Sequence, residues 1–136
     1  DYCRVRDDEK SEIRMPKILI VDDIRLNRIV AARILEVVNT GLEEAENGKK
    51  AVSLCNTSKY DLILMDILMP VMGGIESAAL ISKSALNKFT PIVALTGAVP
   101  GEVSNVYYTF GMIDWVSKPI KREVLTETIC LHLPPE

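Results

Sequence analysis

Histidine and cysteine are scarce in this sequence. Its 136 residues include one histidine, His132, and three cysteines, Cys3, Cys55 and Cys130. The cysteines are odd in number, far apart and without a C-x-x-C pair, so they carry no disulfide or metal-site signature. We therefore expect reduced thiols in a cytoplasmic protein, with a disulfide or a metal site as the alternative. His132 is expected to be solvated at the end of the last helix, where a cation is favourable.

Long apolar runs and an excess of basic residues are also missing. No run approaches the roughly 20 apolar residues that a transmembrane helix needs, and no signal peptide is visible. The 16 Lys and Arg residues are outnumbered by 19 Asp and Glu residues, for a net charge of −3. This charge indicates neither direct nucleic-acid binding nor contact with a membrane surface. Hydrophobic residues make up 48% of the chain, which suits one soluble domain.

Five short apolar segments alternate with five segments of helical periodicity, after a mixed-charge lead over residues 1–15 that we expect to be a linker or flexible arm. The expected strands cover about 17–21, 42–46, 60–65, 91–95 and 113–116, and the expected helices about 26–38, 49–55, 75–81, 101–110 and 123–133. This alternation predicts an α/β fold with a parallel sheet and helices on both faces. In the first helix, the expected buried stripe consists of Leu26, Val30, Ile34 and Val38.

Polar side chains stand where the expected strands end. Asp22 and Asp23 follow the first strand, Asp66 the third, Thr96 the fourth and Lys118 the fifth. In a parallel sheet these ends share one edge, so the side chains should converge. Taken singly, the acids could be a helix N-cap and its solvated neighbour, Thr96 a turn residue and Lys118 a surface lysine. Their shared place at successive strand ends favours a site.

Such a cluster suits phosphoryl transfer assisted by Mg²⁺. Close carboxylates raise one another's pKa unless a cation lies among them, and Mg²⁺ prefers a few carboxylates together with several waters. Asp66, the lone acid on a buried strand, is the best candidate for a nucleophile that becomes an aspartyl phosphate. Asp22 and Asp23 are better placed to hold the metal, while Lys118 and the metal would neutralise the phosphoryl oxygens.

Five motifs occur in order along the chain. They are Val21-Asp22-Asp23, Ala45-Glu46-Asn47-Gly48, Met65-Asp66-Ile67-Leu68-Met69-Pro70, Ala94-Leu95-Thr96-Gly97 and Lys118-Pro119-Ile120. Together they resemble the response-regulator receiver domain of two-component signalling, and Asn27-Arg28 is most similar to receivers of hybrid histidine kinases. The resemblance implies a flavodoxin-like, doubly wound five-stranded parallel sheet of order 2-1-3-4-5 with five helices. Residues 16–136 would form the receiver domain.

The resemblance also implies a role for each residue of the cluster. Asp66 would accept a phosphoryl group from a phosphohistidine. Asp23 and Asp66, with the backbone carbonyl of Leu68, would bind Mg²⁺, and Asp22 would contribute through water. Lys118 would pair with the phosphoryl group, and its peptide bond to the following proline would be cis. The chain would then be no enzyme but a phosphoacceptor that assists its own phosphorylation.

A phosphodonor and a switch follow from the same resemblance. Because His132 is the only histidine, the phosphohistidine must come from a partner, either a histidine kinase or a histidine phosphotransfer protein. Ile24 and Ile29 are candidate docking residues for this donor, or packing residues. Thr96 would swing inward to a phosphoryl oxygen, and Trp115 stands where the family has a Tyr or Phe that rotates on activation.

An output partner would bind the face formed by the fourth helix, fifth strand and fifth helix, and a homodimer is left open. The aromatic residues of this region are expected to be core or rim residues, or to form that face: Tyr107, Tyr108, Phe110 and Trp115.

Leu68 and Ala98 each stand two residues beyond a site residue, and their apolar side chains cannot orient a water molecule that would hydrolyse the aspartyl phosphate. We therefore expect a long-lived phosphoprotein.

Four positions depart from the family pattern: Ile24, Gly73, Phe110 and Trp115. Gly73 replaces the usual Asp and Ile24 a frequent Asn, but none of the four removes a phosphorylation group. The alternative function is a pseudo-receiver, a constitutive interaction module, which only Trp115 and Gly73 favour. An aspartyl hydrolase would need an acid in place of Leu68. A flavin-binding relative would need a phosphate-cradling loop after the first strand, where this chain has acids.

Overall fold

The computed structural model describes residues 15–38, 40–97 and 108–133. Of the charged lead expected over residues 1–15, only Met15 falls among them. No helix in the described ranges combines the length and apolar character needed to cross a membrane.

A five-stranded parallel sheet forms the centre of the molecule, with strand order β2-β1-β3-β4-β5. The strands are β1 (Lys17–Val21), β2 (Gly41–Ala45), β3 (Leu62–Asp66), β4 (Ile92–Thr96) and β5 (Met112–Ser117). The strand order that the resemblance implies is therefore confirmed. Because β1, β3 and β4 are interior strands, their residues are shielded on both faces, which explains their continuous apolar runs.

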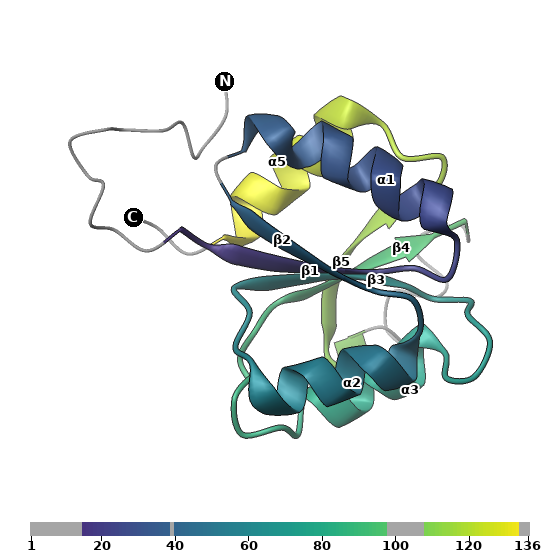
Figure 1. Cartoon of the computed structure of the whole chain (residues 1–136), viewed down its shortest axis with the longest axis vertical. Coiled ribbons are helices and arrows are strands. Elements are labelled where there is room, and N and C mark those ends of the chain that lie inside the picture. Colours follow the sequence, from purple (N-terminus) through teal and green to yellow (C-terminus); the bar gives the residue numbers. More distant parts are fainter. Residues whose placement is uncertain (1–14, 39, 98–107, 134–136) are drawn as a thin grey trace.

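Helices cover both faces of the sheet: α1 and α5 lie on one face, and α2 and α3 on the other (Figure 1). Their bounds are α1 (Arg25–Ile34), followed by the 3₁₀ turn η2 (Leu35–Val37), then α2 (Gly48–Thr57), α3 (Gly74–Ile81) and α5 (Arg122–His132). The structure thus shows four of the five expected α-helices in the described ranges. The helix expected over 101–110 lies mostly outside them.

Two hydrophobic clusters flank the sheet because alternate strand residues face opposite sides. On the α1 and α5 face, the strands contribute Ile18, Ile20, Leu62, Leu64, Val93, Leu95 and Val116. On the α2 and α3 face, they contribute Leu19, Val21, Ala45, Ile63, Met65, Ile92, Ala94 and Met112. The site at the carboxyl ends of the strands therefore rests on a core that is packed from both sides.

The buried face of α1 differs from the expected stripe. Leu26 is 65% exposed and Val30 is 38% exposed. The buried residues in this segment are Ala31, Ile34, Leu35 and Val38. A strict fourfold spacing drifts around the helix by about 40° at each step, because a turn holds 3.6 residues. The combined spacing of three and four residues keeps one side of the helix on the core.

A polar network ties the opposite edge of the sheet together. The buried Asn87 donates hydrogen bonds to the carbonyl oxygens of Cys55 at 2.7 Å and Ser58 at 2.8 Å, and accepts one from the N–H of Tyr60 at 2.9 Å. Asp61, just before β3, accepts a hydrogen bond from the N–H of Lys17 at 2.8 Å. Since these groups are far from the strand carboxyl ends, they anchor the fold and not the site.

The cysteines differ from one another. Cys130 is disulfide-bonded, so the expectation of reduced thiols is wrong for this residue. The sequence could not show this, because spacing along the chain does not reveal which distant residues meet after folding. Cys55 is a free thiol in the core.

Alkali is expected to destabilise the fold through Cys55. Burial raises the pKa of its thiol from 9.0 to about 12. The folded state therefore favours the neutral thiol, and this contribution to stability is complete below pH 9 and lost as the pH rises towards 12. Urea unfolding of the wild type and of Cys55→Ala between pH 8 and 11 measures it. We expect the stability difference between the two to narrow above about pH 9, and a constant difference would contradict this account.

Candidate metal and phosphoacceptor site

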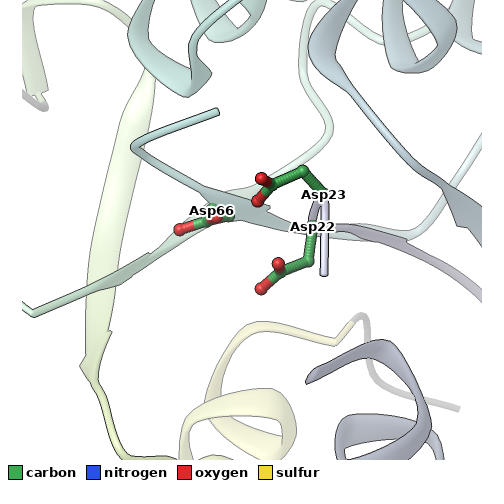
Figure 2. Close-up of side chains that lie close together, drawn as sticks. All are labelled: Asp22, Asp23 and Asp66. Carbon is green, nitrogen blue, oxygen red and sulfur yellow. The ribbon is translucent and has the colours of Figure 1, made fainter. Parts of the chain in front are cut away.

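Three carboxylates meet at the carboxyl edge of the sheet. Asp22 and Asp23 follow β1, and Asp66 is the last residue of the neighbouring β3. Figure 2 shows the three side chains gathered at these two strand ends. One oxygen from each carboxylate lies within 4.8 Å of the others. Asp22 and Asp66 are buried, whereas Asp23 is half-buried.

Lys118 brings a positive charge into this cluster from the end of β5. Its Nζ lies 2.8 Å from Asp66 Oδ1 and 3.2 Å from Asp22 Oδ2. The backbone N–H of Lys118 donates to the carbonyl oxygen of Thr96 at 2.8 Å, and Thr96 is the buried last residue of β4. The peptide bond from Lys118 to Pro119 is cis, as the resemblance implies. All five residues expected at the strand ends therefore lie at one edge of the sheet.

The three acids differ in how far the protein itself satisfies them. Asp22 Oδ1 accepts a hydrogen bond from the N–H of Ile24 at 2.9 Å, and the Asn27 amide lies 3.4 and 3.3 Å from the two Asp22 oxygens. Asp66 Oδ1 accepts from Lys118. Within the described residues, no hydrogen bond or ion pair reaches Asp66 Oδ2 or the Asp23 carboxylate. These are the oxygens best placed to bind a cation or a phosphoryl group directly.

The cluster holds three carboxylates but only one ammonium group among the described residues. Burial raises the pKa of Asp66, and the neighbouring Asp22 and Asp23 add to that shift while Lys118 opposes it. Burial alone would lower the pKa of Lys118, but its bond to Asp66 and the charge of Asp22 outweigh burial and raise it. Three carboxylates facing one ammonium group fit a divalent cation with oxygen ligands, such as Mg²⁺.

Val71 lies in the loop that follows Asp66 and has a φ of 72°. A β-branched residue in the left-handed region is strained, because its Cβ crowds the backbone. We expect Val71→Gly to raise the free energy of unfolding by about 1 kcal/mol, since the strain of such a residue is of this order. Val71→Ala keeps a Cβ and is expected to gain less. Urea unfolding of both variants checks this, and a Val71→Gly variant less stable than the wild type would contradict it.

Sequence reasoning missed the importance of Gly74, the first residue of α3. A Cβ placed on Gly74 would overlap the carbonyl oxygen of Asp66 and approach Ile67 Cα to 2.9 Å. The N–H of Gly74 also donates to the carbonyl oxygen of Ile67 at 2.9 Å. The start of α3 therefore packs directly against the backbone that carries Asp66. The adjacent glycines at 73 and 74 are the sequence signal for such a close approach of two backbone segments.

The expected docking and switch residues lie around this edge. Ile24 is 52% exposed and Ile29 is 41% exposed, so both side chains reach the surface, and Ile24 directly follows the acid pair in the chain. Trp115 is half-buried on β5 and lines a pocket of about 330 Å³ together with Ser117, Lys118, Pro119, Lys121 and Val124.

The remaining aromatic residues and the histidine complete this part of the molecule. Tyr108 and Phe110 are exposed, and Tyr107 and Ala98 lie outside the described residues. His132 Nε2 lies 2.8 Å from Asp114 Oδ2, and only 18% of the His132 side chain is exposed. The expectation of a solvated His132 is therefore wrong, because an acid on β5 faces it from the neighbouring element.

Comparison with known proteins agrees with this geometry. The sequence model of the response regulator receiver domain matches residues 18–130. Over 128 residues the chain is 37% identical to the aerobic respiration control sensor protein ArcB of Escherichia coli, a match covering 90% of the chain and 16% of that protein. The chain spans between 12% and 17% of the length of ArcB and three other curated relatives.

Solved structures show the same fold. The chemotaxis response regulator CheY4 of Vibrio cholerae superposes with a TM-score of 0.83 at 31% identity, covering 88% of this chain and all of that chain (100%). The receiver domain of a Pseudomonas aeruginosa sensor histidine kinase, which has a magnesium ion coordinated in its active-site cleft, gives a TM-score of 0.79 at 28% identity and covers 88% of this chain and 98% of that one. This chain belongs to the response regulator receiver domain family.

Proposed function

We propose that this receiver is the phosphoacceptor of a two-component phosphorelay and that Asp66 takes a phosphoryl group from a partner's phosphohistidine. One observation carries the proposal: Asp66 Oδ1 is held by Lys118 at 2.8 Å, while within the described residues no hydrogen bond or ion pair reaches Asp66 Oδ2. A carboxylate oriented through one oxygen and unpaired at the other is prepared for nucleophilic attack. The donor would be a histidine kinase or a histidine phosphotransfer protein.

In the proposed reaction, Asp66 Oδ2 forms a bond to phosphorus as the bond between phosphorus and the donor imidazole breaks. The imidazole nitrogen keeps the electron pair of that bond and afterwards takes a proton from solvent. Lys118 neutralises charge on the phosphoryl oxygens, and Thr96 supplies a hydroxyl donor to one of them. When bound by Asp23, Asp66 and the Leu68 carbonyl, with Asp22 acting through water, Mg²⁺ would supply further neutralisation.

The output would follow from the added charge. A phosphoryl group brings negative charge and strong acceptor oxygens, and Thr96 lies beside β5, where Ser117 is its register partner and Trp115 lies two residues before it. The exposed Tyr108 and Phe110 would form part of an output face on β5 and α5. The same face would be available to a second copy of the chain. Ile24 and Ile29 would contact the donor.

A cytoplasmic location is also part of the proposal. The disulfide at Cys130 is unusual for that compartment. Trapping the thiols in intact cells before lysis tests the location directly. A Cys130 recovered as a reduced thiol would support the cytoplasmic location, and a Cys130 recovered in its disulfide would place the domain elsewhere.

The phosphorylated form is expected to be long-lived. Leu68 follows Asp66 by two residues and is 85% exposed, so an apolar side chain stands where a polar one could orient the attacking water. We expect the label to persist for minutes or longer at neutral pH with Mg²⁺ present. Leu68→Glu is expected to shorten this lifetime severalfold. This is less than the roughly 100-fold or more that a well-positioned general base contributes. Loss of most label from the wild type within seconds would contradict the prediction.

Labelling by phosphoramidate tests the proposed function, because this compound carries the same phosphorus–nitrogen bond as phosphohistidine. The wild type should gain one phosphoryl group in the presence of Mg²⁺ and none with a chelator. Transfer from a purified histidine phosphotransfer protein provides the physiological version of the test. No label from either donor would overturn the proposal and favour the pseudo-receiver.

A further inference from the structure

We infer that Arg28 is a positioning residue that sets the direction of the acid pair for cation binding. This inference deepens the proposed function and rests on it. Arg28 belongs to α1 and does not contact the Asp66 carboxylate. Its guanidinium group connects the loop that carries Asp22 and Asp23 to the edge strand β2.

Two short hydrogen bonds define this connection. Arg28 Nη1 donates to the backbone carbonyl oxygen of Asp22 at 2.7 Å, and Arg28 Nε donates to Glu44 Oε1 at 2.8 Å. Only 13% of the Arg28 side chain is exposed, against 49% for Glu44. The Arg28 side chain is therefore largely buried, and two of its guanidinium nitrogens donate hydrogen bonds. An ordinary surface ion pair is exposed and holds its side chains in place only weakly. The fixed fork of the guanidinium group suits such a two-point attachment.

The carbonyl that Arg28 holds belongs to the peptide between the two acids. Because a peptide unit is planar, fixing the Asp22 carbonyl also fixes the direction in which Asp23 leaves it. Asp22 lies one residue beyond β1, and within the described residues no backbone N–H donates to its carbonyl oxygen. Arg28 is therefore the group in this part of the chain that satisfies the buried carbonyl and orients both carboxylates.

The start of α1 makes this support necessary. Ile24 occupies the N-cap position, and no side-chain hydrogen bond caps the helix there. A polar N-cap residue would tie the loop to the first turn of the helix. In this chain the loop is held instead by the N–H of Ile24 and the amide of Asn27, both bonded to the Asp22 carboxylate, and by Arg28.

Replacing Arg28 changes the Mg²⁺ affinity in opposite directions under two explanations, positioning of the ligands and electrostatic repulsion of the cation. Removing a positive charge next to a cation site should tighten cation binding if charge alone matters. Removing a group that orients the ligands should weaken binding, typically by 10-fold to 100-fold for an outer-shell partner. We therefore expect Arg28→Met to bind Mg²⁺ about tenfold more weakly than the wild type. Arg28→Lys keeps the charge but cannot reproduce the fork, so it should restore only part of the affinity.

The experiment is a titration of the metal-free chain with Mg²⁺ alone, followed by backbone amide NMR. The wild type is compared with Arg28→Met, Arg28→Lys and Glu44→Gln, and the thermal unfolding of each metal-free variant reports whether it folds. Lys17→Met is the matched control. It removes the 2.9 Å ion pair to Glu43, which joins β1 to β2 at the end of β1 opposite to the acids. This variant should leave the Mg²⁺ affinity unchanged.

Each outcome has a distinct meaning. Weaker Mg²⁺ binding by Arg28→Met, with partial recovery in Arg28→Lys, supports the positioning role. Binding by folded Arg28→Met that equals or exceeds that of the wild type overturns it, as does a wild type that binds no Mg²⁺. Should Arg28→Met not fold, Arg28→Lys and Glu44→Gln decide the question by the same criterion. A wild type that binds Mg²⁺ but takes no phosphoryl group would defeat the proposed function and leave the result for Arg28 readable.

Discussion

Asp66→Asn is expected to abolish phosphorylation by phosphoramidate. The amide keeps the shape of the side chain but is no nucleophile, and the oxygen that would bond to phosphorus becomes part of a neutral group. Because no other carboxylate in the cluster is held by Lys118 as closely as Asp66 is, at 2.8 Å, we expect no compensating label on Asp22 or Asp23. Intact-mass measurement after incubation with Mg²⁺ checks the result.

The same substitution is expected to stabilise the metal-free protein. Burial and the two neighbouring acids raise the pKa of Asp66, so the ionised form is disfavoured in the folded state. Replacing it by a neutral amide removes this cost, and we expect a gain of about 0.5–2 kcal/mol in the free energy of unfolding, as at other functional sites that trade stability for activity. Urea unfolding in a chelator measures it.

Asp61→Asn provides the matched control for both measurements. Asp61 is also buried and stands at the other end of β3, where it accepts a hydrogen bond from the N–H of Lys17. It should keep full labelling and gain no stability. Undiminished labelling of Asp66→Asn would contradict the assignment of the phosphoacceptor.

Gly74→Ala is expected to impair both the fold and the phosphorylation. The added methyl group would overlap the carbonyl oxygen of Asp66, so α3 and the end of β3 must move apart. Overpacking of this kind costs about 1–3 kcal/mol of stability. A displacement of about 1 Å at a reacting group can slow a reaction up to about 100-fold. We therefore expect a lower rate of labelling at saturating Mg²⁺, measured by intact mass over time.

Gly73→Ala is the control for this prediction. A Cβ on Gly73 meets nothing closer than the carbonyl oxygen of Ile67 at 3.5 Å, and Gly73 has a φ of −73°, which an alanine adopts without strain. This variant should fold and label like the wild type. Equal labelling rates for the two alanine variants would show that the contact between Gly74 and Asp66 does not position the acceptor.

Much of the fold and of the site followed from the sequence, because both depend on where buried strands end. The apolar run before Asp66 identifies an interior strand, and a parallel sheet must bring Thr96 and Lys118 to the same edge. This reasoning needs only the alternation of strands and helices. It therefore predicted the parallel sheet and the convergence of the polar residues without information on any individual contact, whereas the strand order came from the resemblance to receiver domains.

The features that the sequence did not reveal depend on contacts between particular side chains. The buried face of α1 depends on which side of the helix meets the core, and a simple fourfold spacing selected Leu26 and Val30 incorrectly. The role inferred for Arg28 depends on a bond to a backbone carbonyl, which no motif records. The disulfide at Cys130 and the pairing of His132 with Asp114 likewise depend on residues that are distant in the chain.

The most direct test of this account locates the phosphoryl group. The wild type is incubated with phosphoramidate in Mg²⁺ or in chelator, trapped with borohydride, which reduces an aspartyl phosphate to homoserine, and analysed by peptide mass spectrometry while Trp115 fluorescence is followed in parallel. We expect homoserine at position 66 alone, only in the sample with Mg²⁺, together with a change in fluorescence. Reduction at another residue, or equal reduction without Mg²⁺, would contradict the assignment of Asp66 as the metal-dependent phosphoacceptor.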